Sequence, residues 1–180
     1  HQSIYDIPIL FWSLPYQLRI IAKASLGHFP FLGWHLRRTG HMLVDRSRPE
    51  RTKIFSWAGR LTADGLSLIV FPEGTRSRDG RLARFKGGPF LIAIDSGLPI
   101  VPVSVSGTRH VMAKGRLTTC PGEVDLVVHD PIPTAGLTYE DRDRLAMRVR
   151  DAMAEVLQRE YGVVSPPWAP RRAVPMDSAD

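Results

Sequence analysis

The chain has 180 residues, 43% of them hydrophobic, which suits one globular domain with a sizeable core and is short for two. Its formal net charge of +6 and sequence pI of about 10.0 indicate an anionic partner, such as nucleic acid, a phosphorylated metabolite or an anionic membrane face. A single cysteine, Cys120, excludes an internal disulfide framework and a cysteine-rich zinc site, and it fits a reducing compartment.

Hydropathy and the start of the chain bear on membrane attachment. No run approaches the roughly 18 apolar residues that would span a bilayer, and no signal peptide pattern is present. Taken alone, the chain is expected to be soluble or peripheral. Because it begins at His1 rather than Met, inside what reads as a continuing element, we expect a piece of a longer protein whose membrane anchors, if any, lie upstream.

The first third of the sequence begins with a helical pattern. Apolar residues spaced by threes and fours predict an amphipathic helix over residues 3 to 22, bent or interrupted at Pro8 and Pro15. The stretch HFPFLGW, residues 28 to 34, predicts a loop with aromatic anchors.

Beyond residue 40, segments with strand and helix patterns alternate. The expected strands cover residues 41 to 45, 66 to 71 and 100 to 105, and the expected helices cover about 49 to 63 and 88 to 96. This order predicts an α/β fold with a mixed, largely parallel central sheet flanked by helices.

The last third adds one or two strands within residues 115 to 129 and then a long helix. Thr138 and Asp141 open this helix, and Gly162 closes it. Its apolar stripe, which should lie on the sheet, consists of Leu145, Val149, Ala152, Met153, Val156 and Leu157. Residues 165 to 180 contain four prolines and predict an irregular tail, so we place the domain at residues 1 to 164.

The stretch FPEGTRSR, residues 71 to 78, follows an apolar strand with a carboxylate and two arginines. Ligands of open α/β sheets bind beyond the carboxyl ends of the strands, and guanidinium groups there can bind phosphate oxygens in pairs. The alternative is a solvated basic loop in which Glu73 pairs with a neighbouring arginine. A second strand-end motif, GHMLVDR at 40 to 46, delivers Arg46, which could reach the same crevice, although a strand ending in Asp-Arg is common.

The motif HQSIYD places His1 five residues before Asp6. A neutral imidazole can take a proton from an alcohol, and a carboxylate on its other nitrogen fixes the tautomer and stabilises the imidazolium. This arrangement requires His1 to lie ahead of the helix and Asp6 to lie in its first turn. Alternatively, Ser3 and Asp6 form an N-cap pair of the helix. The remaining histidines lack metal-ligand spacing, so we predict no metal site.

In order, HQSIYD, GHMLVDR, FPEGTRSR and IVPVSV resemble the four motif blocks of the glycerolipid acyltransferases, most closely the 1-acyl-sn-glycerol-3-phosphate acyltransferases. The resemblance covers residues 1 to 107 and implies a glycerol-3-phosphate acyltransferase-like fold. It implies transfer of a fatty acyl group from a thioester of coenzyme A or acyl carrier protein to the hydroxyl of 1-acylglycerol 3-phosphate, giving phosphatidic acid, with no cofactor.

The resemblance also implies residue roles. His1 is the general base and Asp6 orients it. The residues implied in binding the acceptor are Lys23, Arg46, Glu73, Gly74, Thr75 and Arg76. The residue chemistry fits, because the substrate alcohol is the nucleophile and the sequence has no serine-nucleophile elbow. The aromatic and basic residues of the first 38 positions suit contact with a membrane, so we expect a peripheral or anchored protein on its cytoplasmic face.

Other functions stay open at this stage. A different acceptor, such as glycerol 3-phosphate or another lysolipid, fits the same motifs. A basic nucleic-acid-binding domain fits the charge, although the basic residues gather at strand ends and no recognition motif is present. A lipid-binding module without catalysis is a further alternative, against which the intact His1, Asp6 and Glu73 argue.

Overall fold

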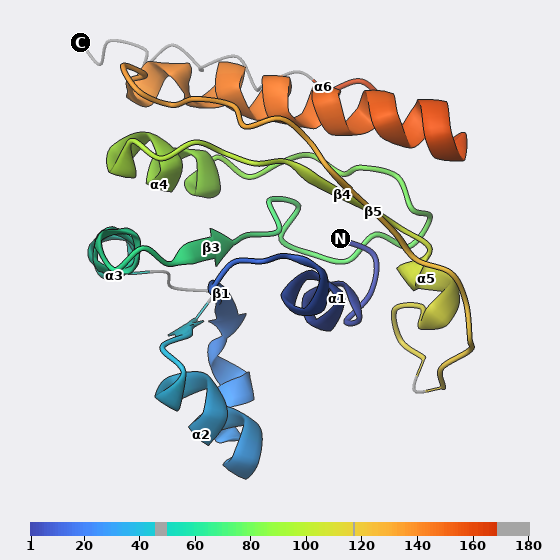
Figure 1. The fold of residues 1–180 in the computed structure, drawn as a ribbon, viewed down its shortest axis with the longest axis horizontal. Helices are drawn as coiled ribbons and strands as arrows, with labels where there is room; N and C mark the ends of the chain where they lie inside the picture. Colours follow the sequence, from blue (N-terminus) through green and yellow to red (C-terminus); the bar gives the residue numbers. More distant parts are fainter. Residues whose placement is uncertain (46–49, 117, 169–180) are drawn as a thin grey trace, which may run out of the picture.

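The structure, a computed structural model, describes residues 1–45, 50–116 and 118–168. The helices are α1 (Asp6–Ser13), α2 (Pro30–Arg38), α3 (Arg51–Ala63), α4 (Gly88–Ser96), α5 (Thr108–Val111) and α6 (Arg142–Tyr161), with 3-10 helices η1 (Ala24–His28) and η2 (Tyr139–Asp141). The strands are β1 (Leu18–Lys23), β2 (Met42–Val44), β3 (Ser67–Ile69), β4 (Val103–Ser106) and β5 (Asp125–Val128). Helix α6 runs along one side of the molecule, and α2 projects from the opposite side (Figure 1).

A parallel sheet of three strands carries the first half of the chain. Strand β1 lies at its centre, paired with β2 on one side and β3 on the other. Side chains of Leu18, Ile20 and Ala22 are buried while those between them are more exposed, because successive residues of a strand point to opposite faces. Because β1 is parallel to both of its neighbours, the carboxyl ends of all three strands meet at one edge of the sheet.

Strands β4 and β5 form an antiparallel pair, with Val103 opposite Val128 and Ser106 opposite Asp125. Within the described residues the strands make up two separate sheets rather than one. The predicted fold class is confirmed: the chain is α/β, with a largely parallel arrangement flanked by helices. The amino terminus lies between the two sheets, beside α1 (Figure 1).

Helix α6 begins and ends as the sequence predicts. Thr138 and Asp141 form a capping box immediately ahead of it, and Gly162 ends it in a left-handed conformation. Four residues of the predicted stripe are buried: Leu145, Val149, Val156 and Leu157. The first two and Leu157 pack with Phe85 and with Phe90 of α4 in the larger hydrophobic cluster, which joins α6 to α4.

Two predictions for the first third of the chain are wrong. The helix expected to continue to residue 22 ends at Ser13, and residues 18 to 23 form β1, the central strand of the sheet. Pro15 lacks the N–H that a continuing helix needs, and beyond it the apolar residues alternate in burial as they do in a strand. The loop expected at 28 to 34 is mostly helix α2, with Pro30 at its first turn, where a missing N–H costs nothing.

Residues 165 to 168, the described part of the predicted tail, form no helix or strand and are held in place by hydrogen bonds. The backbone N–H of Leu82 donates to Ser165 Oγ at 2.9 Å, and Arg150 Nη2 donates to the carbonyl of Pro166 at 2.6 Å. Arg150 is buried, and this burial lowers the pKa of its guanidinium from the ordinary value. Residues 169 to 180 of the predicted tail lie outside the described residues. Among the helices described, none has the length and hydropathy needed to cross a bilayer.

Candidate active site

A histidine and an aspartate form a close pair at the amino terminus of the chain. His1 Nδ1 lies 2.6 Å from Asp6 Oδ2. The His1 side chain is 14% exposed and that of Asp6 is completely buried, so the imidazole lies between the carboxylate and the surface. His1 precedes α1 and Asp6 is its first residue, as the arrangement predicted from the sequence requires. Because Nδ1 faces Asp6, Nε2 is left to act on a ligand.

The Asp6 carboxylate accepts hydrogen bonds at both oxygens. Besides His1, Oδ2 accepts from the backbone N–H groups of Gln2 at 2.7 Å and Ser3 at 3.1 Å. Oδ1 accepts from the hydroxyl of Thr108 at 2.5 Å. A buried carboxylate is tolerated only when such donors replace water.

The N-cap alternative for Ser3 and Asp6 is half realised. Ser3 N–H does donate to Asp6, and the Ser3 hydroxyl accepts from the N–H of Tyr5 at 3.3 Å while it donates to the carbonyl of Met112 at 2.7 Å. Both interpretations of the motif therefore describe part of the same network.

The loop after β3 wraps around His1. Glu73 Oε1 accepts from the backbone nitrogen of His1 at 2.7 Å, and the N–H of Ser77 donates to the His1 carbonyl at 2.7 Å. The imidazole stacks on the ring of Phe71, with centroids 4.0 Å apart. Glu73 is 6% exposed and pairs with the backbone of His1, where the solvated-loop alternative expected an arginine. The FPEGTRSR loop thus fixes the main chain and the ring of His1.

Gly74 makes the turn of this loop possible. Its φ of +69° lies in the left-handed region that side chains disfavour, and an added Cβ would lie 2.7 Å from Nζ of Lys86. The Gly74 N–H donates to the carbonyl of Phe71 at 3.0 Å. Glycine therefore lets the chain reverse beside Lys86 without strain.

Thr75 and Arg76 are joined to a lysine that the sequence analysis did not identify. Lys114 Nζ donates to Thr75 Oγ1 at 3.0 Å and to the Arg76 carbonyl at 3.3 Å. Lys114 lies 38 positions beyond Arg76 and belongs to no motif, so no sequence signal could have found it. Because the Thr75 oxygen accepts from Lys114, its own hydrogen is directed elsewhere.

Lys23 and the end of β2, the strand that precedes Arg46 in the sequence, lie at the same edge of the parallel sheet. Lys23 is the last residue of β1, is exposed and pairs in register with Val44, the last residue of β2. Arg46 follows two positions later and lies outside the described residues. The topology brings the ends of β1, β2 and β3 together, so Lys23 shares an edge with the FPEGTRSR loop.

The basic residues farther along the loop are more open to solvent. Arg78 and Arg81 are exposed, whereas Arg76 is half-buried. Asp79 lies 3.8 Å from Arg81 Nε, and hydrogen bonds from the Arg81 N–H and the Ser77 hydroxyl lower the pKa of its carboxyl group. The solvated-loop interpretation therefore describes Arg78 and Arg81 better than it describes Arg76.

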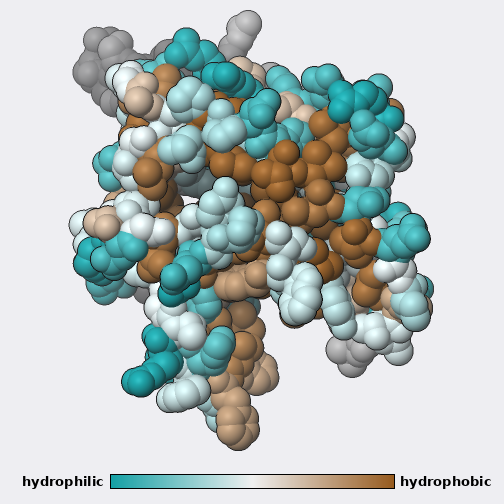
Figure 2. Space-filling model, in the orientation of Figure 1, coloured by the Kyte–Doolittle hydropathy of each residue, from teal (hydrophilic) through white to brown (hydrophobic). Residues whose placement is uncertain are grey.

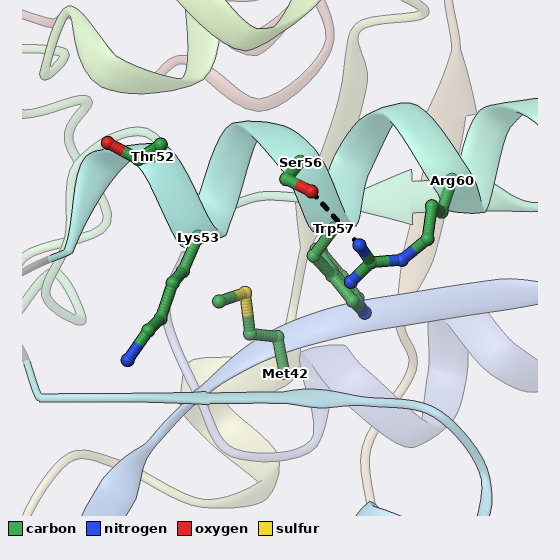
Figure 3. Close-up of a pocket in the computed structure, with 6 residues that line it drawn as sticks. All are labelled: Met42, Thr52, Lys53, Ser56, Trp57 and Arg60. Atoms are coloured by element: carbon green, nitrogen blue, oxygen red, sulfur yellow. Dashed lines mark hydrogen bonds between the residues drawn. The ribbon is translucent and has the colours of Figure 1, made fainter.

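A separate hollow of about 420 Å³ lies between β2 and α3 (Figure 3). Arg60 Nη1 donates to Ser56 Oγ within it, at 2.9 Å. Its lining is Met42, Thr52, Lys53, Ser56, Trp57 and Arg60. None of the predicted site residues that the structure describes is among them, and His1 and Asp6 do not line the hollow.

In an α/β fold, a His–Asp pair at a strand-end loop rich in arginine has the chemistry to activate an alcohol and to bind an anionic group beside it. Residues 1–106 match the family described as Acyltransferase, and the chain belongs to that family. The resemblance on which the sequence analysis relied is thereby confirmed.

Known relatives agree with this assignment. The chain is 36% identical over 162 residues to a 1-acyl-sn-glycerol-3-phosphate acyltransferase of Chlamydomonas reinhardtii, covering 89% of this chain and 47% of the relative. It is 37% identical over 136 residues to a protein of the same name from Cocos nucifera, covering 74% and 44%. The crystal structure of the 1-acyl-sn-glycerophosphate acyltransferase PlsC from Thermotoga maritima superposes with a TM-score of 0.76 at 32% identity, covering 94% of this chain and 66% of that one. The chain thus spans about half the length of these curated relatives.

Proposed function

We propose that the protein containing this chain transfers a fatty acyl group from a thioester to the free hydroxyl of 1-acylglycerol 3-phosphate, giving phosphatidic acid. The observation that carries the proposal is the His1–Asp6 pair, held by the FPEGTRSR loop beside a half-buried arginine. Relatives at 36% and 37% identity bear the name of this activity. Residues 1 to 164 supply the acyltransferase domain, and the tail begins at residue 165.

His1 Nε2 takes the proton of the acceptor hydroxyl while the hydroxyl oxygen attacks the carbonyl carbon of the thioester. The tetrahedral intermediate then collapses, the C–S bond breaks, and His1 returns the proton to the thiolate. Asp6 holds Nδ1 and stabilises the imidazolium between these two steps. No cofactor is needed. The thioester is a co-substrate, either acyl-coenzyme A or the fatty acyl thioester of acyl carrier protein.

The intermediate requires hydrogen-bond donors for its negatively charged oxygen. The N–H groups of Gly74 and Ser77 already donate to Phe71 and His1. The loop positions between them, Thr75 and Arg76, are therefore the better candidates. A fixed donor of this kind lowers the free-energy barrier by about 3 kcal/mol.

The acceptor phosphate is proposed to bind at the shared edge of the parallel sheet, on Arg76 with Arg46 and Lys23. Glu73, Gly74 and Thr75 shape the loop that presents Arg76. A guanidinium group binds phosphate through two parallel hydrogen bonds, which makes the phosphate-bearing lysolipid a better acceptor than a neutral one.

Arg76→Ala is expected to raise the KM for lysophosphatidate by about 10-fold or more with little change in kcat, because a charge-assisted hydrogen bond contributes about 1.5–3 kcal/mol. The measurement is acyl transfer from labelled palmitoyl and oleoyl thioesters to lysophosphatidate, other lysophospholipids, glycerol 3-phosphate and monoacylglycerol, using the full-length protein. Arg81→Ala is the matched control, because Arg81 is exposed and pairs with Asp79.

The outcomes separate the alternatives. Preference for another phosphate-bearing acceptor would retain the mechanism and correct the substrate. Equal use of monoacylglycerol, or no effect of Arg76→Ala on KM, would refute the proposed phosphate site. DNA binding without any thioester turnover would favour the nucleic-acid alternative.

We also propose that the protein works at the cytoplasmic face of a membrane and contacts it through an aromatic limb, defined as Trp12 of α1, Phe29, and Phe31, Leu32 and Trp34 of α2. Phe31 is 89% exposed, and Trp12 of neighbouring α1 is 93% exposed. Figure 2 shows apolar surface along this projecting part and in the middle of the same face. Arg37 and Arg38 in the last turn of α2 would face anionic headgroups.

The double variant Trp12→Ser, Phe31→Ser is expected to bind vesicles of phosphatidylcholine and phosphatidylglycerol at least 10-fold more weakly, because burying one aromatic side chain contributes about 1.5–3 kcal/mol. Cosedimentation of the full-length protein with the vesicles measures this. Tyr139→Ser removes a 61% exposed aromatic from a distant element and should change nothing. Equal binding by both variants would show that the aromatic limb does not contact the membrane.

A further inference from the structure

Thr108 is the buried hydroxyl that completes the environment of Asp6. It is fully buried, and its Oγ1 donates to Asp6 Oδ1 at 2.5 Å. Asp6 Oδ1 is the carboxylate oxygen that does not face His1, and Thr108 is the donor that the structure gives it. A buried carboxylate oxygen without a hydrogen-bond donor costs free energy. The Thr108 hydroxyl supplies the donor that water cannot supply in this buried site.

The chain is built to hold Thr108 in this place. Gly107, just before it, has a φ of +92°, and an added Cβ there would lie 2.2 Å from the carbonyl oxygen of Glu123. Only glycine can therefore occupy the turn from β4 into α5. The turn sets the first residue of α5 against the first residue of α1.

Two more hydrogen bonds join the same two segments. Gln2 Nε2 donates to the carbonyl of Val105 at 3.2 Å, and Ser3 Oγ donates to the carbonyl of Met112 at 2.7 Å. Residues before, at and after Thr108 thus all contact the segment between His1 and Asp6. The β4–α5 segment and the residue after it therefore support the pair through three hydrogen bonds.

From this geometry we propose that Thr108 is a positioning residue of the acyl-transfer site: its hydroxyl fixes the plane of the Asp6 carboxylate so that Oδ2 stays directed at His1 Nδ1. This inference rests on the proposed function for its catalytic consequence. Without the hydroxyl, the carboxylate is held at Oδ2 alone and can turn about the bond to its Cβ. The imidazole would then lose the orientation that points Nε2 at the acceptor hydroxyl.

The test compares Thr108→Val, which has the same shape without a hydroxyl, with Thr108→Ser, which keeps it. We expect kcat to fall roughly 10-fold in the valine variant with unchanged KM values, and to stay within about 3-fold of wild type in the serine variant. Thermal unfolding of both variants, in the full-length protein, shows how much of the change reflects stability.

The NMR resonance of the His1 Nδ1–H provides a readout that a merely structural role would not change, because its chemical shift reports the hydrogen bond to Asp6 Oδ2. Without the Thr108 donor the carboxylate can turn away from Nδ1, which weakens that hydrogen bond. We therefore expect this resonance to move toward that of an imidazole without a carboxylate partner in Thr108→Val and not in Thr108→Ser.

The NMR spectrum separates failure of this inference from failure of the proposed function. If the wild-type protein transfers no acyl group, the function is wrong, and a shifted His1 Nδ1–H resonance in Thr108→Val would still support the positioning role. If the valine variant keeps the wild-type resonance and kcat, Thr108 does not position the pair. Equal losses in the valine and serine variants would also overturn the proposal, because packing and not the hydroxyl would then be responsible.

Discussion

His1→Ala is expected to lower kcat for acyl transfer by about 10²- to 10⁴-fold, the usual contribution of a general base. The loss of fold stability should be small, about 1–2 kcal/mol, from the ring stack on Phe71 and one hydrogen bond. Asp6 retains its other three donors, from Gln2, Ser3 and Thr108. Initial rates at saturating thioester and denaturant unfolding of the same preparation measure the two effects.

His1→Asn is the matched control for this variant. Its side-chain amide can occupy the place of Nδ1 and donate to Asp6, yet it cannot accept a proton from an alcohol. We expect it to be as inactive as His1→Ala and closer to wild type in stability. Wild-type turnover by either variant would remove His1 from the mechanism.

Asp6→Ala is expected to impair folding as well as catalysis. It removes the acceptor of four donors, and since each buried unpaired donor costs about 1–3 kcal/mol, we expect the free energy of unfolding to fall by about 3 kcal/mol or more. Loss of activity in this variant therefore does not by itself establish a catalytic role. Urea unfolding with the rate assay quantifies the stability component.

Asp6→Asn separates the two roles. Its amide oxygen can accept from the backbone of Gln2 and Ser3, and its NH₂ group can donate to the Thr108 oxygen, so stability should stay within about 1 kcal/mol of wild type. A neutral amide cannot stabilise the imidazolium, so kcat should still fall about 10²- to 10⁴-fold. A fully active, stable asparagine variant would show that Asp6 only supports the fold.

The helices and strands differ in how well local sequence patterns predict them. Helix α6 was predicted with its bounds because its capping box, apolar period and terminal glycine are all local signals. Strand β1 was missed although it is the centre of the sheet, because the spacing of its apolar residues also continued a helical pattern. Helix α2 was missed because its aromatic residues are exposed and hide the amphipathic pattern.

Local sequence likewise predicts some features of the candidate site and not others. The sequence by itself determined which residues could form a base and its partner, because Asp6 follows His1 by five positions and lies in the first turn of the helix. It also determined that arginines follow strand β3. These features depend only on neighbouring residues, whose geometry the backbone fixes locally.

The tertiary structure alone decided what surrounds that pair. It placed the Glu73 carboxylate on the backbone of His1, the Thr108 hydroxyl on Asp6 and the Lys114 amine on Thr75, contacts that join positions up to 102 residues apart. Such contacts follow from how the sheets and helices pack, and packing depends on the shape of the whole core rather than on any local pattern. The sequence therefore identifies the groups that we propose to react, and the fold provides the neighbours that hold them in position.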